Sequence, residues 1–166
     1  LKLIRDSDGV VQVVGFGTYL KPLSKPTLDK LEALRARFDL QPLQGLANAL
    51  MPGDAVIAIW PEARFGEYAG NLYGIIDEEP KATLKDFGDA IDYVVKKIGI
   101  DHVGISSDFN DGGGLDGWKD VSEARNVTAE LISRGYSEAD IAKLWGGNFL
   151  RVWEQVQKSS KPVVNR

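Results

Sequence analysis

Two short apolar runs, separated by a strongly amphipathic helix, constrain the fold of this chain more than any other feature. The runs are Val10–Phe16 (VVQVVGF) and Ile100–Phe109 (IDHVGISSDF). Short, β-branched and nearly continuous apolar runs are typical of strands buried on both faces, as in a parallel sheet. The helix expected at residues 83–98 directly precedes the second run. The order strand, helix, strand predicts a βαβ unit, with the helix outside two parallel strands.

The helix at 83–98 has signals at both ends and along one face. Thr83 and Asp86 form a Thr-x-x-Asp variant of the capping box, and Gly99 is suited to end the helix. Apolar residues recur at helical spacing between these ends, at Leu84, Phe87, Ile91, Val94, Val95 and Ile98. This stripe predicts one face packed against the strands.

Further helices are expected on both sides of this unit. Thr27 is expected to cap a helix that reaches Phe38, and residues 40–80 are expected to be irregular and mainly helical, interrupted by glycine and proline. Within that stretch, Ala55–Trp60 fits either a strand or a turn of buried helix. Three short helices are expected after the second run, opened by Ser122, Ser137 and Asn148. Trp118, Trp145 and Trp153 are expected to pack in the core or at an interface.

Composition excludes several classes of function. The 166 residues suffice for one domain with a core, and the net charge of −4 with no Lys/Arg run argues against a nucleic-acid partner. No apolar run reaches the roughly 18 residues of a transmembrane helix, so no membrane-spanning segment is expected in this chain. Cysteine is absent and His102 is the single histidine, so a site built from several imidazoles or thiolates cannot be assembled from this chain alone.

Asp108 is the candidate for chemistry. It ends the second apolar run and is followed by the glycine-rich stretch up to Gly114. In α/β barrels, the C-terminal ends of the strands form the active-site face. An acidic residue in such a loop can equally be a turn former, so the local pattern leaves both interpretations open. His102 lies about 20 Å away at the other end of the run, and we expect it to be half-buried and hydrogen-bonded to backbone.

Two separated motifs give the chain a family resemblance. They are DHVGISSDFNDGGGLDGW and, further on, RGYSEADIAKLWGGNFLRV. Both resemble the C-terminal signature of the membrane (renal) dipeptidase family of zinc-dependent metallopeptidases, particularly its bacterial members, in which the patterns are close to HVGIGSDFDG and GGNFLRV. Weaker similarity covers the rest of the chain. Asn110 departs from the family pattern, which usually has a second Asp there.

The resemblance implies an α/β fold, the C-terminal portion of a (β/α)8 TIM barrel. Residues 1–166 would form the C-terminal part of a single barrel domain, with the last two strands, outer helices and C-terminal helices. Val10–Phe16 would be the seventh strand and His102–Asp108 the eighth. Two strands cannot close a barrel, so the remainder of the same polypeptide is expected as a partner.

The resemblance also implies a function. It implies a zinc-dependent dipeptidase that hydrolyses dipeptides, including those with a D-residue at the C-terminal position. Its Zn2+ ions, about two per active site, would be held by the N-terminal portion that is not in this chain, so no metal ligand is expected here. By position, Asp108 would be the catalytic acid/base and contact the substrate, and Tyr19 would lie near the substrate.

Two alternatives remain at this point. The chain could belong to a barrel relative that lost its metals and serves binding or assembly, or to another TIM-barrel amidohydrolase-like enzyme. The GGNFLRV motif argues against the second, because a generic barrel has no reason to share it. A homodimer is compatible with the resemblance, since dimers are common in the family, and the sequence does not indicate the compartment.

Overall fold

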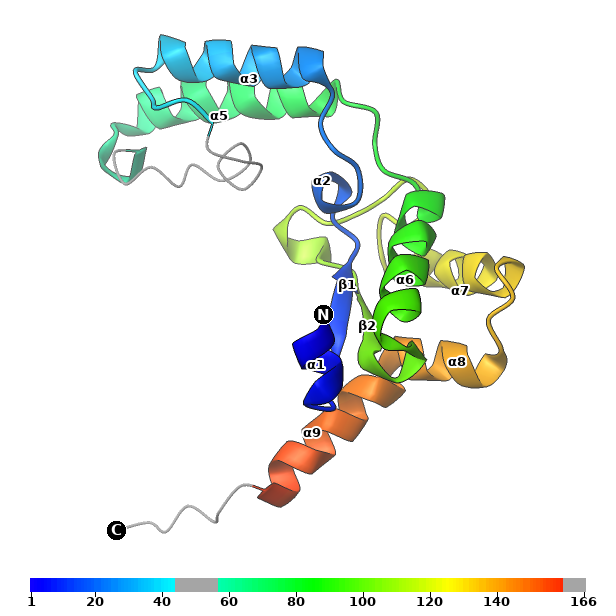
Figure 1. The fold of residues 1–166 in the computed structure, drawn as a ribbon. Helices are drawn as coiled ribbons and strands as arrows, with labels where there is room; N and C mark the ends of the chain where they lie inside the picture. Colours follow the sequence, from blue (N-terminus) through cyan, green and yellow to red (C-terminus); the bar gives the residue numbers. More distant parts are fainter. Residues whose placement is uncertain (44–56, 160–166) are drawn as a thin grey trace, which may run out of the picture. The chain divides into compact units, whose positions relative to one another are not determined.

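The computed structural model describes residues 1–43 and 57–159, which form two compact units (Figure 1). One unit combines Leu1–Lys21 with the chain from Lys81 onward, and the other is Pro22–Pro80. The first is mixed α/β, with two parallel strands, and the second is helical. In these ranges no helix is both long and apolar enough to cross a bilayer.

The first unit carries two strands, several helices and a set of short helical turns. In chain order it contains α1 (Lys2–Asp6), β1 (Val11–Val14), α2 (Gly17–Leu20), α6 (Leu84–Ile98), η2 (Ile100–His102), β2 (Val103–Ser106), η3 (Phe109–Asp111), η4 (Val121–Glu123), α7 (Ala124–Ser133), α8 (Glu138–Ala142), η5 (Lys143–Gly147) and α9 (Asn148–Ser159).

β1 and β2 pair in parallel, with Val11 opposite Val103 and Val14 opposite Ser106. The predicted βαβ order is therefore confirmed, with α6 between the strands in sequence. Both strands are shorter than predicted. The second begins only at Val103 because the residues after Gly99 first form the turn η2, and it ends before Asp108, whose backbone is left-handed with φ of 59°. A left-handed residue cannot continue a strand.

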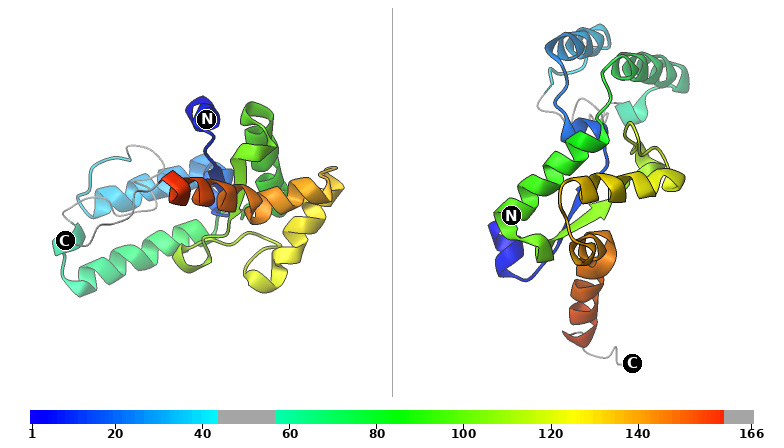
Figure 2. Two further views of the ribbon diagram at one scale, coloured as in Figure 1. Left: turned by 90° about the horizontal axis from the view of Figure 1, so that it is seen from below. Right: turned by 90° about the vertical axis from the view of Figure 1, so that its right-hand side faces the viewer.

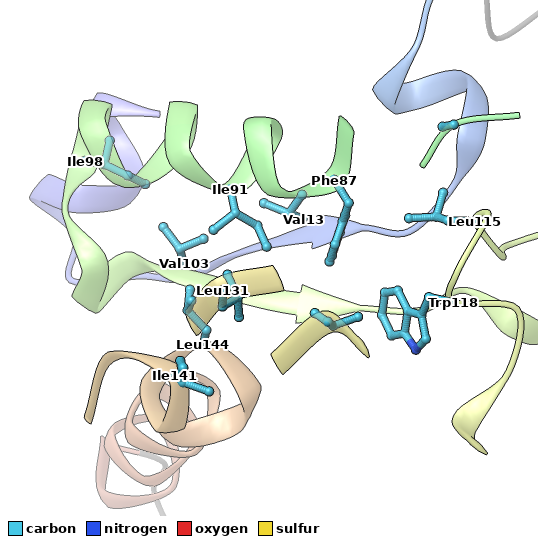
Figure 3. Close-up of a cluster of buried hydrophobic side chains, with 12 residues drawn as sticks. Val13, Phe87, Ile91, Ile98, Val103, Leu115, Trp118, Leu131, Ile141 and Leu144 are labelled. Carbon is cyan, nitrogen blue, oxygen red and sulfur yellow. The ribbon is translucent and has the colours of Figure 1, made fainter. Parts of the chain in front are cut away.

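The core of this unit lies between α6, the sheet and the C-terminal helices (Figure 3). Phe87 and Ile91 of α6 are buried together with Val13 and Val103 of the two strands. Burying each such side chain contributes about 1.5–3 kcal/mol. Trp118 is 2% exposed, which confirms its predicted place in the core.

Local capping signals fix both the start and the end of α6. The Thr83 N–H donates to Asp86 Oδ2 at 2.8 Å, and the Asp86 N–H donates to Thr83 Oγ1 at 3.4 Å, so the predicted capping box is confirmed. The pKa of the Asp86 carboxyl is held below its ordinary value, mainly by the hydrogen bond from the Thr83 backbone N–H and next by that from the Thr83 hydroxyl. Gly99, with φ of 92°, ends the helix as predicted.

The C-terminal helices follow the predicted order, with two corrections. Ser122 does not open the first of them, because Asp120 caps the turn η4 by accepting from the Ser122 N–H, and α7 begins at Ala124. The capping box of Ser137 and Asp140 opens α8, and the π-helical turn η5 then leads directly into α9. The prediction that Asn148 caps the last helix is wrong. The Asn148 amide is buried and donates to the carbonyl oxygens of Ile100 at 2.7 Å and Val103 at 2.8 Å. These backbone groups at the start of β2 need a donor once they are removed from water.

The second unit is a helical hairpin of α3 (Lys25–Arg37) and α5 (Glu62–Asp77), with the turn η1 (Ile57–Ile59) before α5 (Figure 1). The cap of α3 is Ser24, whose hydroxyl accepts from the Thr27 N–H, so the prediction that Thr27 is the cap is wrong. Pro26 explains the shift, because proline suits the first helical turn and lacks an N–H. Of the ambiguous run Ala55–Trp60, residues 55 and 56 lie outside the described residues, and the next three form η1.

α5 is longer and more regular than predicted. Its glycines, Gly66, Gly70 and Gly74, were expected to interrupt the segment, yet they lie within one continuous helix. Glycine weakens a helix but does not break it. The helix is stabilised by Tyr68 and Leu72, which lie on the side away from the glycines. Both are buried in the apolar cluster that α5 shares with α3.

Glu79 joins the two ends of the second unit. The Ser24 N–H donates to Glu79 Oε1 at 3.0 Å, and the Ser24 hydroxyl donates to Oε2 at 2.9 Å. The Thr27 hydroxyl also donates to Oε2. The carboxylate after α5 therefore binds the first turn of α3, where the helix dipole favours negative charge.

Arg134, directly after α7, ties α7 to α6. Its guanidinium donates to Glu130 Oε1 at 2.8 Å, to Asp92 Oδ2 at 2.6 Å and to Asp89 Oδ1 at 2.9 Å. The Arg134 side chain is only 15% exposed. It crosses α6 at Gly88, where a Cβ atom would lie 2.3 Å from Arg134 Nε. The contact thus requires both the arginine and the glycine beneath it.

We expect the substitution Arg134→Met to lower the free energy of unfolding by about 1–3 kcal/mol, because three carboxylates lose a shielded, charge-assisted donor. Arg125→Met, at an exposed position within α7, is the matched control and should change the free energy of unfolding by less than about 0.5 kcal/mol. Urea titration followed by tryptophan fluorescence measures both. Equal effects of the two substitutions would contradict the assignment.

Candidate functional site

The loops that follow β1 and β2 are bound to each other. The Gly15 N–H donates to the Ser106 carbonyl oxygen at 2.7 Å, so the pairing continues one residue past β1. The Gly114 N–H then donates to the Gly15 carbonyl oxygen at 3.0 Å. Because the strands are parallel, their C-terminal ends meet at one edge of the sheet, and the loops that carry the two candidate residues both leave from this edge.

Asp108 has a strained and closely supported backbone. Its φ of 59° and ψ of 26° place it in the left-handed region, which costs a non-glycine residue about 1 kcal/mol or more. The Gly113 N–H donates to the Asp108 carbonyl oxygen at 2.7 Å and closes the loop. A Cβ on Gly113 would lie 2.3 Å from the Ser107 carbonyl oxygen, so this approach requires glycine.

The Asp108 carboxylate is available to an external group. The residue is half-buried. Within the described residues its side chain takes part in no hydrogen bond or ion pair. A carboxylate held on a fixed backbone, with its oxygens uncommitted, can accept a proton or bind a cation.

Tyr19 lies on α2, just after β1, and is 65% exposed. Its ring packs edge-on against Phe16, with the centroids 4.8 Å apart. Phe16 also approaches the other loop, because a Cβ on Gly112 would lie 3.2 Å from Phe16 Cε2. In the part of the chain that is described, no hydrogen bond or ring contact joins Tyr19 directly to Asp108. Phe16 is the intermediary, and the sequence indicated it only through its two flanking glycines.

One face of the sheet is turned away from α6. Val11, Val13, Val103 and Ile105 pack in or against the core cluster, so the alternate residues of each strand lie on the opposite face. On that face Gln12 is paired with Gly104, where a Cβ would lie 2.2 Å from Gln12 Oε1. Gln12 Oε1 is buried without a hydrogen-bond partner among the described residues. Because side chains alternate between the two faces of a strand, this face could have been indicated by the sequence.

His102 lies at the other end of the sheet, as predicted. Its Nδ1 is 2.9 Å from the Gly9 carbonyl oxygen and 4.0 Å from Asp8 Oδ1, and the side chain is 14% exposed. The prediction of a half-buried histidine hydrogen-bonded to backbone is confirmed. The residue is therefore a structural link between the segments that enter the two strands.

The side chains that the structure describes contain no candidate metal centre. Among these described side chains, no three His, Cys, Asp or Glu residues come together in a way that could hold a metal ion. Asp108 is an isolated carboxylate within this set.

One protein-family model and several known proteins resemble this chain. The family model of the membrane dipeptidases (peptidase family M19) matches residues 1–166. The crystal structure of the probable dipeptidase PvdM from Pseudomonas aeruginosa is 78% identical, with a TM-score of 0.84, over 96% of this chain and 40% of that one. The match supports the observed α/β arrangement.

Two of the curated relatives are fungal dipeptidases. Dipeptidase aclJ of Aspergillus oryzae is 33% identical over 68% of this chain and 25% of its own length, and dipeptidase ataJ of Aspergillus terreus is 49% identical over 42% of this chain and 17% of its own. This chain thus spans about a quarter or less of these relatives. Because the family model matches every residue from 1 to 166, the chain belongs to the membrane dipeptidase family, peptidase family M19.

Proposed function

We propose that residues 1–166 form the C-terminal part of a single TIM-barrel dipeptidase domain, with β1 and β2 as its seventh and eighth strands. The proposal is supported by the parallel pairing of the strands, with α6 packed outside them. It is also supported by the match to 40% of the PvdM chain. Chemistry at the C-terminal ends of strands is the rule in such barrels.

The proposed reaction is hydrolysis of dipeptides, including those with a D-residue at the C-terminal position. The uncommitted carboxylate of Asp108, fixed at the C-terminal end of β2, is the observation that carries the proposal. Asp108 accepts the proton of the attacking water and delivers it to the leaving amine. A carboxylate there can also hold the free ammonium of the dipeptide. The exposed Tyr19 on α2, in the segment that follows β1, is a proposed substrate contact.

The proposed reaction depends on zinc ions, whose ligands we place in the polypeptide outside this chain. When bound, about two zinc ions would activate water and polarise the scissile carbonyl. The residues described here take the remaining tasks, which are to orient the dipeptide and to move the proton.

The complete polypeptide is expected to bind about two zinc ions and to cleave simple dipeptides. Chelation should abolish the cleavage, and added Zn2+ should restore it, since the proposed reaction depends on the metal. Metal analysis and an assay of released amino acid measure the two properties. A complete protein that is folded, free of zinc and inactive would instead favour a barrel relative that has lost catalysis.

The substitution Asp108→Asn should lower kcat by about 10²–10⁴-fold, because the proton carrier is lost. Zinc content should stay the same, since Asp108 is not a proposed ligand. Asp6→Asn, at an exposed position in α1 before β1, is the control and should leave kcat unchanged. An unaltered rate for Asp108→Asn would show that its role is misassigned.

The substitution Gly113→Ala should displace Asp108, because the added methyl group would meet the Ser107 carbonyl oxygen at 2.3 Å. We expect kcat to fall by roughly 10-fold or more, as small misplacements of catalytic groups do. Gly70→Ala is the control, since a Cβ there meets nothing within 4 Å and the residue lies within α5. Steady-state kinetics with parallel circular dichroism tests this, and normal kinetics for Gly113→Ala would show that the loop does not position Asp108.

A further inference from the structure

α9 crosses the N-terminal ends of both strands (Figure 2). Its first residue, Asn148, donates to backbone at the start of β2. One turn later, Arg151 donates to the carbonyl oxygen of Asp101, before β2, at 2.8 Å and to that of Asp8, before β1, at 3.0 Å. A further turn on, the Gln155 amide donates to Asp8 Oδ2 at 2.9 Å. The contacts therefore progress from β2 to β1 along the helix.

The helix extends beyond its contact with β1. α9 ends at Ser159, so residues 156–159 follow Gln155. At about 1.5 Å per residue these four cover about 6 Å, whereas neighbouring strands lie about 4.8 Å apart. The extension is thus long enough to reach one more strand. Within the described residues β1 pairs with β2 alone, which leaves the other edge of β1 without a neighbouring strand.

One flank of α9 is apolar and exposed. The exposed fractions are 43% for Phe149, 64% for Leu150, 56% for Trp153 and 61% for Val156. Phe149, Trp153 and Val156 follow at helical spacing, and the first two rings are 5.9 Å apart. Large apolar side chains gathered on one side of a helix mark an interaction surface.

We propose that this flank of α9 docks on the strand that lies beside the free edge of β1, and on the segment that enters it, in the part of the dipeptidase polypeptide outside this chain. The proposal continues an interface that exists, because the same helix already binds the segments entering β2 and β1. A neighbouring strand would also pair the open edge of β1. A second copy of the chain on α9 would cover the apolar flank but leave that edge open.

The test is the substitution Val156→Glu in the complete polypeptide, with Ile132→Glu as its matched control. The two positions are 61% and 60% exposed, and both lie near the C-terminal ends of their helices, α9 and α7. A charge in a docked surface should lower Tm by about 4 °C or more, whereas the control should shift it by about 1 °C. Equal shifts for the two variants would overturn the proposal.

Two further measurements keep the test decisive. If Val156→Glu does not fold while Ile132→Glu does, docking is supported, and Val156→Ala against Ile132→Ala should then show the same order with smaller shifts. Light scattering tests whether a second copy of the chain occupies this surface instead. A dimer that Val156→Glu converts to a monomer, with Tm unchanged at low concentration, would assign the surface to a second copy and overturn the proposal. None of these readouts depends on dipeptide hydrolysis, so an inactive protein would leave the docking proposal standing.

Discussion

Parallel strands cannot be joined by a tight turn, so the pairing of β1 with β2 obliges the chain to leave the sheet and return across it. Residues 15–102 make this connection, and α6 provides its final crossing. The register of Val11 with Val103 then brings together the two segments that enter the strands and the two loops that leave them. The rest of the first unit is organised around these two ends of the sheet.

The two ends meet opposite requirements. At the N-terminal ends, carbonyl groups are closely paired with the side chains of Asn148, Arg151 and His102. At the C-terminal ends, the backbone of Asp108 is left-handed and its carboxylate is uncommitted. In α/β barrels the N-terminal ends of the strands serve stability and the C-terminal ends carry the chemistry, and the proposed barrel placement would give this sheet the same division. It explains why a strained residue can persist, because the firmly bonded end maintains the register that supports it.

Features that depend on a few residues close together in the sequence could be predicted. The two strands, the capping box of Thr83 and Asp86, and the amphipathic face of α6 all depend on local spacing. Asp108 and Tyr19 lie in the segments that follow the C-terminal ends of the two strands, and this location follows from the parallel order. Their roles in the reaction stay predictions.

Features that join distant residues could not be predicted in this way. Asn148 has the sequence context of a helix cap, but two carbonyl groups more than 40 residues earlier engage its amide. The sequence does not distinguish Arg134 from the other arginines, because its role depends on the close approach of α6 at Gly88. Phe16 links the two loops only because the strand register places Gly112 beside it. In each case the partner is chosen by the tertiary fold.

The carboxylate of Glu79 has a consequence for how such a chain can evolve. It holds the first turn of α3 to the end of the helical hairpin, so the hairpin begins and ends at nearly the same point. An insertion with adjoining ends adds little to the span that the rest of the connection must cover. The hairpin can therefore lengthen, shorten or exchange its surface residues while the register of the sheet is conserved. A change in the length of this hairpin leaves the separation of its two ends unchanged.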